Sequence, residues 1–351
     1  MNGSSSCSPL FEEPVLLIVV GGLNAASGFV SLLASCLVIA LIVLFKKWQF
    51  FTQRLVLYLA ISVVFQSIAA MIIKVDYNNE TSEFYLHFCQ FSGFVAQNAT
   101  WMVLNAVASI TVYVFVGAVF SKQTDRFEAV YLFFIFVFPL LINWIPFIDT
   151  AYGKAGVWCW IRSEDDFCNK FLFGQVLQFV LWYIPLYLIL TILLFLYAVI
   201  LVKIHCYDRR RWTGNYKFVD EQHQIKMISR EIRSLLRYPL IYFLINLFPL
   251  ALRIYGAFES NTSKLLPLWI LTAIFFPIQG GFMALAFTLD PDTRKRLRWV
   301  QIKSAAKELC RRSDKDFISE YPAEHIISDA ENSSMYKTNY HPVKNHANDK
   351  D

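Results

Sequence analysis

One arginine stands inside an otherwise apolar run, "LINLFPLALRIYGAFE", where its chemistry is hard to explain as packing. A guanidinium at the centre of a lipid bilayer costs about 2.5–3.5 kcal/mol on insertion scales. Arg253 therefore either extends toward the nearer membrane surface or turns inward to pair with an anion. Asn246 lies two helical turns earlier on the same face, which favours the inward direction. Pro249 lies between them, as a fixed kink or as a hinge.

Amides and indoles recur at helical spacing in two further apolar runs. One set is Asn98, Trp101 and Asn105, and the other is Gln175, Gln178 and Trp182. Each set lies along one face of a helix. Amides at this spacing either hold neighbouring helices together or line a ligand pocket, and the spacing is compatible with both.

The apolar runs contain no group that typifies a reaction centre. They hold no paired carboxylates, no histidine relay and no His-Glu-x-x-His pattern, and no Cys/His cluster has metal spacing. The last apolar run has no lysine for a retinal Schiff base. We therefore expect no enzyme activity, no cofactor and no metal ion, and these absences disfavour a proton-driven transporter or a retinal pump.

Composition indicates that these residues belong to a polytopic membrane protein. Charged residues make up 17% of the 351-residue chain, whereas a soluble domain carries about a quarter. Uncharged runs of about 20 residues are long enough to cross the hydrocarbon core as helices. We predict an all-α membrane protein, a seven-transmembrane helix bundle, with spans at 15–45, 55–73, 89–120, 129–147, 171–202, 235–257 and 265–289. The predicted parts are a short extracellular N-terminus (1–14), the bundle (15–290), a juxtamembrane amphipathic eighth helix (291–310) and a disordered cytosolic tail (311–351).

Charge sets the predicted orientation. Of the 32 lysines and arginines, 26 flank the spans on one side and five on the other, and cytosolic loops are the ones that collect such residues. This predicts an extracellular N-terminus and a cytosolic tail in a multi-pass protein of the plasma membrane. Three glycosylation sequons fall on the predicted outer side, at Asn2, Asn79 and Asn261.

The stretch "VWCWI" falls in the predicted outer loop between the fourth and fifth spans. Its Cys159 and the Cys89 at the outer start of the third span form a pair that an oxidising exterior would bridge. Cys7 and Cys168 are also predicted outside, and of the three pairings that four cysteines allow we favour Cys89–Cys159 with Cys7–Cys168. Two tryptophans flank Cys159, Trp158 and Trp160. They form a lid over the bundle, with one packed inward, or they are ordinary interface aromatics.

The predicted cytosolic side carries a long basic loop after the fifth span. Residues 221–237 have an apolar stripe at helical spacing together with Arg230, Arg233 and Arg237. This pattern suits a partner's amphipathic helix or, alternatively, lipid headgroups. After the seventh span, Asp292 is predicted to cap a basic amphipathic helix on the inner leaflet.

Seven spans, the bridge to Cys89, the basic loop and the amphipathic helix together resemble G-protein-coupled receptors. Rhodopsin-like signatures are missing, since the third span ends "VGAVFSKQTDRF" and the seventh "MALAFTLDP". The stretches "VWCWI", "LLRYPLIYFLINLFPLALRI" and "PIQGGFMALAFTLDP" are similar to the cyclic-AMP-receptor-like family, which is related to secretin and adhesion receptors. By this resemblance Arg253 corresponds to an arginine of cyclic AMP receptors, which would suit an anionic phosphate.

The resemblance implies a receptor that passes the binding of a small extracellular ligand, cyclic AMP or another anion, to a heterotrimeric G protein. The implied ligand site comprises Arg253, Asn246, Trp158, Trp160, Asn98, Trp101, Gln175 and Gln178, and Arg230, Arg233 and Arg237 contact the C-terminal helix of Gα. The implied partners are this ligand, the G protein and the lipid bilayer, with no nucleic acid as a macromolecular partner. A seven-span transporter of small solutes and a non-signalling decoy receptor remain as alternatives.

Overall fold

Helices make up almost all of the structure, a computed structural model. It describes residues 14–72, 83–120, 124–155, 158–162, 171–212, 235–258, 266–290, 293–294, 297 and 301–304, of which 14–17, 203–212 and 253–258 are described by their backbone alone. The chain divides into two units, Met1–Ile302 and Lys303–Asp351, and every element described below belongs to the first.

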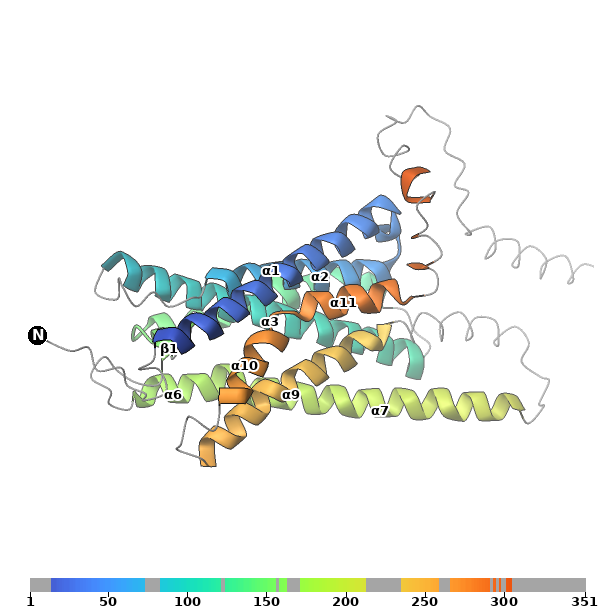
Figure 1. Ribbon diagram of the computed structural model, residues 1–351. Helices are drawn as coiled ribbons and strands as arrows, with labels where there is room; N and C mark the ends of the chain where they lie inside the picture. The colour runs from blue at the N-terminus through green and yellow to red at the C-terminus, as the bar shows by residue number, and fades with distance from the viewer. Residues whose placement is uncertain are drawn as a thin grey trace, which may run out of the picture. The chain divides into compact units, whose positions relative to one another are not determined.

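Within the described residues, seven helical segments follow one another along the chain and pack side by side (Figure 1). Five are helices long and apolar enough to cross a membrane, one is a bent pair of helices, and one is a helix whose apolar part is shorter. The first three are single helices, α1 (Pro14–Leu44), α2 (Phe51–Ile72) and α3 (Glu83–Phe120). The fourth comprises α4 (Glu128–Leu132), η4 (Phe133–Val137) and α5 (Phe138–Ile142), and the fifth α6 (Leu172–Gln178), η6 (Phe179–Tyr183) and α7 (Ile184–Trp212). The sixth is α9 (Arg237–Phe258), and the seventh is the pair α10 (Leu266–Phe275) and α11 (Gln279–Thr288). The predicted multi-pass helix bundle is thus confirmed.

Two spans are longer than hydropathy predicts. Helix α3 begins at Glu83 rather than near Cys89, and the fifth span continues to Trp212 rather than ending near Val202. Hydropathy marks where lipid contact ends, whereas backbone hydrogen bonds continue into polar sequence that is still a good helix former.

Proline disturbs three of the spans and leaves a fourth unbroken. Pro139 and Pro185 each follow a π-helical segment, η4 and η6. Pro277 lies in the break between α10 and α11, whose axes differ by 48°. Pro249, by contrast, lies inside the continuous helix α9. A hinge at Pro249 therefore stays a prediction, and the sharp bend of the described spans occurs in the seventh.

Small polar residues fix this bend against the first two spans. The backbone N–H of Gly280 donates to Ser31 Oγ at 2.9 Å, and the Ser67 hydroxyl donates to the same oxygen, also at 2.9 Å. The Gly280 N–H is one of the first donors of α11, which have no partner within their own helix. The neighbouring helix α1 thus caps α11.

Candidate functional site

A two-stranded hairpin lies at one end of the bundle, which we call the hairpin end. Strands β1 (Tyr152–Ala155) and β2 (Trp158–Ile161) pair antiparallel, with Lys154 opposite Cys159. Figure 1 places β1 near the start of α1 and near α6. The hairpin was not foreseen as strands, because "VWCWI" was placed only as a loop.

The predicted disulfide between Cys89 and Cys159 is present. It joins α3 to β2 with a Cα–Cα distance of 5.2 Å. Gly93, one turn further along α3, lets the strand approach, since a Cβ there would lie 3.2 Å from the Trp160 backbone N and Cα. Cys7 and Cys168 lie outside the described residues, so their pairing stays a prediction. The hairpin backbone is thereby held against α3 at two successive turns.

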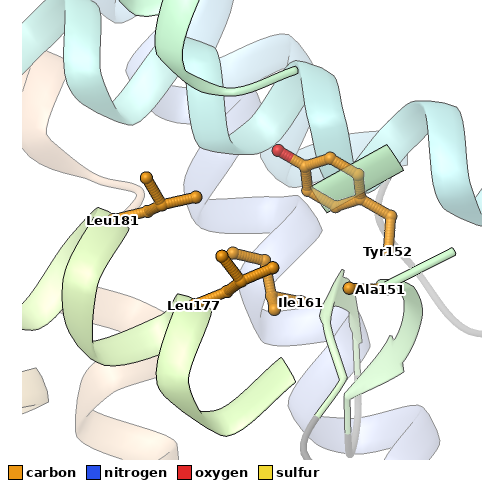
Figure 2. Packing of buried hydrophobic residues seen from close by; sticks show 5 residues of the cluster. All are labelled: Ala151, Tyr152, Ile161, Leu177 and Leu181. Atoms are coloured by element: carbon orange, nitrogen blue, oxygen red, sulfur yellow. The ribbon is translucent and has the colours of Figure 1, made fainter. Parts of the chain in front are cut away.

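One face of β2 packs into an apolar cluster. Ile161 points toward Leu177 of α6, with Tyr152 of β1 beside them (Figure 2). The Tyr152 hydroxyl donates to the Asn143 carbonyl at 2.9 Å. Burial raises the pKa of the Tyr152 hydroxyl well above its usual value, so it remains a donor at neutral pH. The cluster seats the hairpin on the fourth and fifth spans.

The other face of β2 presents Trp158 and Trp160 to different helices. The Trp158 ring packs on Trp269 of α10 at 5.0 Å between centroids, within a cluster that includes Val20 of α1. The Trp160 ring meets Tyr183 of the fifth span edge-on at 6.0 Å. Both tryptophans are partly buried against the bundle. Both rings thus contact helices of the bundle, Trp158 at α10 and Trp160 at η6, and their role as a lid stays a prediction.

An amide that the sequence analysis passed over connects the hairpin to the fifth span. Gln97 Oε1 accepts the Trp160 indole N–H at 2.6 Å, and Gln97 Nε2 lies 3.5 Å from the Leu181 carbonyl oxygen. Trp101 Nε1 donates to the same carbonyl at 3.0 Å. Pro185, four residues after Leu181, has no N–H to offer it. Side chains of α3 therefore donate to a carbonyl in the turn where Pro185 supplies no backbone N–H.

The other predicted amides also bind backbone or one another. Asn98 donates to its own helix at Phe94, and its Oδ1 lies 3.3 Å from Asn143 Nδ2. Gln178 donates to the Ile161 carbonyl at 2.6 Å, and Gln175 is half-buried on α6. These contacts hold helices and hairpin together. A role of Asn98, Trp101, Gln175 and Gln178 in binding a ligand stays a prediction.

Asn105 likewise donates to a carbonyl that lies close to a proline, in the fourth span. Its Nδ2 donates to the Phe134 carbonyl at 2.8 Å. In the π-helical segment the Phe138 N–H bonds to Phe133, which leaves Phe134 to pair with Pro139, a residue without an N–H. The amide of α3 replaces the missing donor.

Replacing Asn105 with alanine is expected to lower the free energy of unfolding by about 1–3 kcal/mol, because the Phe134 carbonyl would be left buried without a donor. Thermal unfolding in detergent measures the effect. The control is Thr100→Val, since Thr100 donates only to Ala96 of its own helix, whose carbonyl already has a backbone partner. Equal melting of both variants would contradict this role of Asn105.

The sixth span contributes a buried amide at mid-helix. Asn246 is 2% exposed and donates to the Tyr242 carbonyl at 2.8 Å. Its Oδ1 has no hydrogen-bond partner among the described residues. Arg253 belongs to α9, two turns further on, and its side chain lies outside the described part of the chain. Pairing of Arg253 with an anion therefore stays a prediction.

The opposite end of the bundle carries charged contacts between spans. Arg54 of α2 pairs with Glu128 of α4 at 2.9 Å, and the Tyr58 hydroxyl donates to the same carboxylate. Arg237 of α9 reaches the Ala286 carbonyl of α11 at 3.4 Å. Arg230, Arg233 and the sequon residues Asn2, Asn79 and Asn261 lie outside the described residues.

A buried lysine holds the segment that follows the seventh span. Lys47 donates to Thr293 Oγ1 at 2.6 Å and lies over the Phe287 ring. Asp290 accepts both the Thr293 backbone N–H and its hydroxyl, as a helix cap does. Asp292, the predicted cap, lies outside the described residues. The cap contacts seen at Thr293 come from Asp290. Within the described residues, no three His, Cys, Asp or Glu side chains are grouped as a metal site.

Comparisons with known proteins agree on the class of fold. Residues 222–296 match the model of a family described as the C-terminal part of G protein-coupled glucose receptors regulating Gpa2. The crystal structure of squid rhodopsin superposes with a TM-score of 0.57 at 15% identity, covering 92% of this chain and 98% of that chain. No curated protein matches the sequence. The matched family model is not that of the cyclic-AMP-receptor-like family, which the comparisons leave unconfirmed.

Proposed function

We propose that this chain is a G-protein-coupled receptor of the plasma membrane that responds to a small polar ligand outside the cell. The observation that carries the proposal is the family match over 222–296, the sixth and seventh spans with the basic segment before them, on a bundle with the rhodopsin fold. That family's description names both a G protein and a ligand. A likeness in fold alone would not distinguish a receptor from another seven-span protein.

In the proposed orientation the hairpin end faces outward. A disulfide persists in an oxidising exterior, and the Cys89–Cys159 bridge lies at that end. Lysines and arginines gather in the loops of the opposite end, as expected of cytosolic loops. The N-terminus is then extracellular, and Arg237 lies where a cytosolic partner can reach the bundle.

The proposed ligand binds beneath Trp158 and Trp160. The described side chains there are amides, indoles and phenols, including Gln97, Trp101 and Tyr183, and these suit an uncharged molecule rich in hydroxyl groups. Glucose, the ligand in the matched family's description, is of this class. Cyclic AMP is the second candidate, and it rests on Arg253 as a partner for its phosphate.

Ligand binding is proposed to act by shifting a balance between two arrangements of the bundle. A ligand changes that balance only to the extent that it binds one arrangement more tightly than the other. The bend of the seventh span lies between the hairpin end and the opposite end, where Arg237 contacts the Ala286 carbonyl. Opening the sixth span away from the seventh would release Arg237 toward the C-terminal helix of Gα.

Nucleotide exchange on purified Gpa2 tests the proposal directly. Membranes bearing the chain are incubated with Gpa2 and its βγ partner, with glucose, with cyclic AMP or with neither. Exchange that rises with glucose supports the glucose receptor, and exchange that rises with cyclic AMP and disappears in Arg253→Ala supports the anion site. Uptake of labelled glucose without exchange would instead favour the transporter, and ligand binding without exchange the decoy receptor.

Neutralising the basic stretch is expected to uncouple the receptor. In the variant with Arg230, Arg233 and Arg237 changed to glutamine, ligand-stimulated exchange should fall at least tenfold while surface expression persists, because the partner's helix loses three cationic contacts. The matched control changes three tail lysines, Lys337, Lys344 and Lys350, to glutamine. An equal loss in both variants would show that overall charge, rather than this stretch, governs coupling.

A further inference from the structure

Gln97 is a buried side chain of α3 that bonds directly to the hairpin. It is 2% exposed, and its Oε1 accepts the Trp160 indole N–H at 2.6 Å. Asn98 and Trp101, its neighbours on α3, are turned to carbonyls or amides of the protein itself. The acceptor of Gln97 is occupied by a side chain of the hairpin, which is partly exposed.

The Trp160 backbone is fixed more firmly than its ring, which packs on Tyr183 and donates to Gln97. The adjoining Cys159 is bonded to Cys89, and Gly93 lies against the Trp160 backbone at 3.2 Å. A ligand arriving from the hairpin end therefore does not need to lift the strand. Rotation of the indole about its side-chain torsions suffices to uncover Gln97, because rotamer changes are far cheaper than breaking a bridged strand.

We propose that Gln97 is the ligand's hydrogen-bonding residue and that the Trp160 indole occupies its place in the unliganded protein. The inference rests on the proposed function, and it adds a residue and a mode of binding. A ligand must present a donor to Gln97 Oε1, as the indole N–H does now. The chemistry that fits is a hydroxyl of an uncharged or ribose-bearing molecule, flanked by the rings of Trp160 and Tyr183.

The same exchange would reach the fifth span. Gln97 Nε2 and Trp101 Nε1 both face the Leu181 carbonyl, at 3.5 and 3.0 Å. When a ligand turns the Gln97 amide, the Leu181 carbonyl keeps the Trp101 indole N–H as a donor and loses Gln97 Nε2. The π-helical segment η6, which contains Leu181, is therefore the first element to sense the ligand.

The first test removes the competing indole N–H. Trp160→Phe keeps a ring against Tyr183 but cannot donate to Gln97, so the ligand no longer displaces a hydrogen bond. We expect half-maximal exchange on Gpa2 at about three- to tenfold lower glucose or cyclic AMP than in the wild type, the worth of one net hydrogen bond. Trp144→Phe is the matched control, at an exposed indole that packs on Phe147 just before the hairpin, and its half-maximal concentration should change less than twofold. An unchanged or higher value in Trp160→Phe overturns the inference.

The second test asks whether Gln97 is the residue that hydrogen-bonds the hydroxyl of the ligand. Monodeoxy analogues of glucose and 2′-deoxy cyclic AMP are compared with their parents on the wild type and on Gln97→Met. In the wild type one analogue should lose at least tenfold in potency, because a site that hydrogen-bonds a hydroxyl rejects the analogue that lacks it. In Gln97→Met that analogue and its parent should be equally potent. A retained tenfold difference overturns the inference, and the responding parent identifies the source of the hydroxyl.

The two failures are distinguishable. A wild-type receptor that responds to neither glucose nor cyclic AMP overturns the proposed ligand class and this inference with it. If the wild type responds and both Trp160→Phe and Gln97→Met respond like the wild type, the receptor proposal is kept. Gln97 is then not part of the ligand site. Surface expression and thermal unfolding of each variant exclude loss of the folded protein as the cause.

Discussion

Replacing Gly280 with alanine is expected to destabilise the protein so strongly that little folded protein is recovered from the membrane. A Cβ at this position would lie 2.3 Å from Ser35 Oγ and 2.4 Å from the Ser31 carbonyl oxygen. Real Cβ atoms do not approach this closely, so α11 must move away from α1. Overpacking a core commonly lowers the free energy of unfolding by about 1–3 kcal/mol. The Ser31 carbonyl oxygen belongs to the backbone and cannot rotate aside, so we expect a loss of about 3 kcal/mol or more at this site.

The movement would also break the cap of the seventh span. The Gly280 N–H now donates to Ser31 Oγ, which accepts from Ser67 as well. Displacing α11 leaves that N–H buried without a partner, which adds about 1–3 kcal/mol to the loss. Thermal unfolding in detergent and the yield of monodisperse protein measure the combined effect.

The neighbouring glycine supplies the control. A Cβ on Gly281 would meet only Ile278 Cγ1 at 3.5 Å, an ordinary van der Waals contact, and one on Gly22 of α1 would meet nothing within 4 Å. Gly281→Ala and Gly22→Ala should therefore be neutral or stabilising by up to about 1 kcal/mol, the helix preference of alanine over glycine. If Gly280→Ala unfolds at the same temperature as these two controls, the close packing of the first and seventh spans does not fix the bend.

The spans and the bridge between Cys89 and Cys159 were predictable because each depends on a property that sequence states directly. Hydrocarbon thickness fixes how long an apolar run must be, and an oxidising exterior selects among cysteines once the topology is set. The two strands around "VWCWI" were not predicted, since four residues each are too few to show a period.

Gln97 was overlooked for a different reason. The search for polar faces followed the spacing of Asn98, Trp101 and Asn105, and Gln97 lies about 100° around the helix from Asn98. Its meaning depends on Leu181 and Pro185, on another span. The proline signals that this turn lacks one backbone N–H, but which side chain donates there depends on the register between α3 and the fifth span, and sequence does not state that register.

Removing the disulfide is expected to abolish the ligand response while leaving a helix bundle. The bridge closes a loop of about 70 residues, for which the chain-entropy account gives about 4 kcal/mol. Helices that persist in the unfolded state within a membrane reduce that figure, so we expect about 2–4 kcal/mol for Cys89→Ser or Cys159→Ser. Trp160 and Trp158 would then lose their fixed strand, and with it their places over Gln97 and Trp269.

Three comparisons make this result specific to the bridge. The double variant, Cys89→Ser with Cys159→Ser, should melt within about 0.5 kcal/mol of either single variant, because the second substitution removes nothing further. Cys36→Ser, at an exposed cysteine of α1, should match the wild type in melting and in exchange. In a background that carries Cys7→Ser and Cys168→Ser, a reducing agent should reproduce the effect of the double variant and should have no effect on the double variant itself. A double variant that still responds to ligand at the wild-type concentration would show that apolar packing of Ile161 and Tyr152 alone seats the hairpin, since the cluster they form with α6 does not involve the bridge.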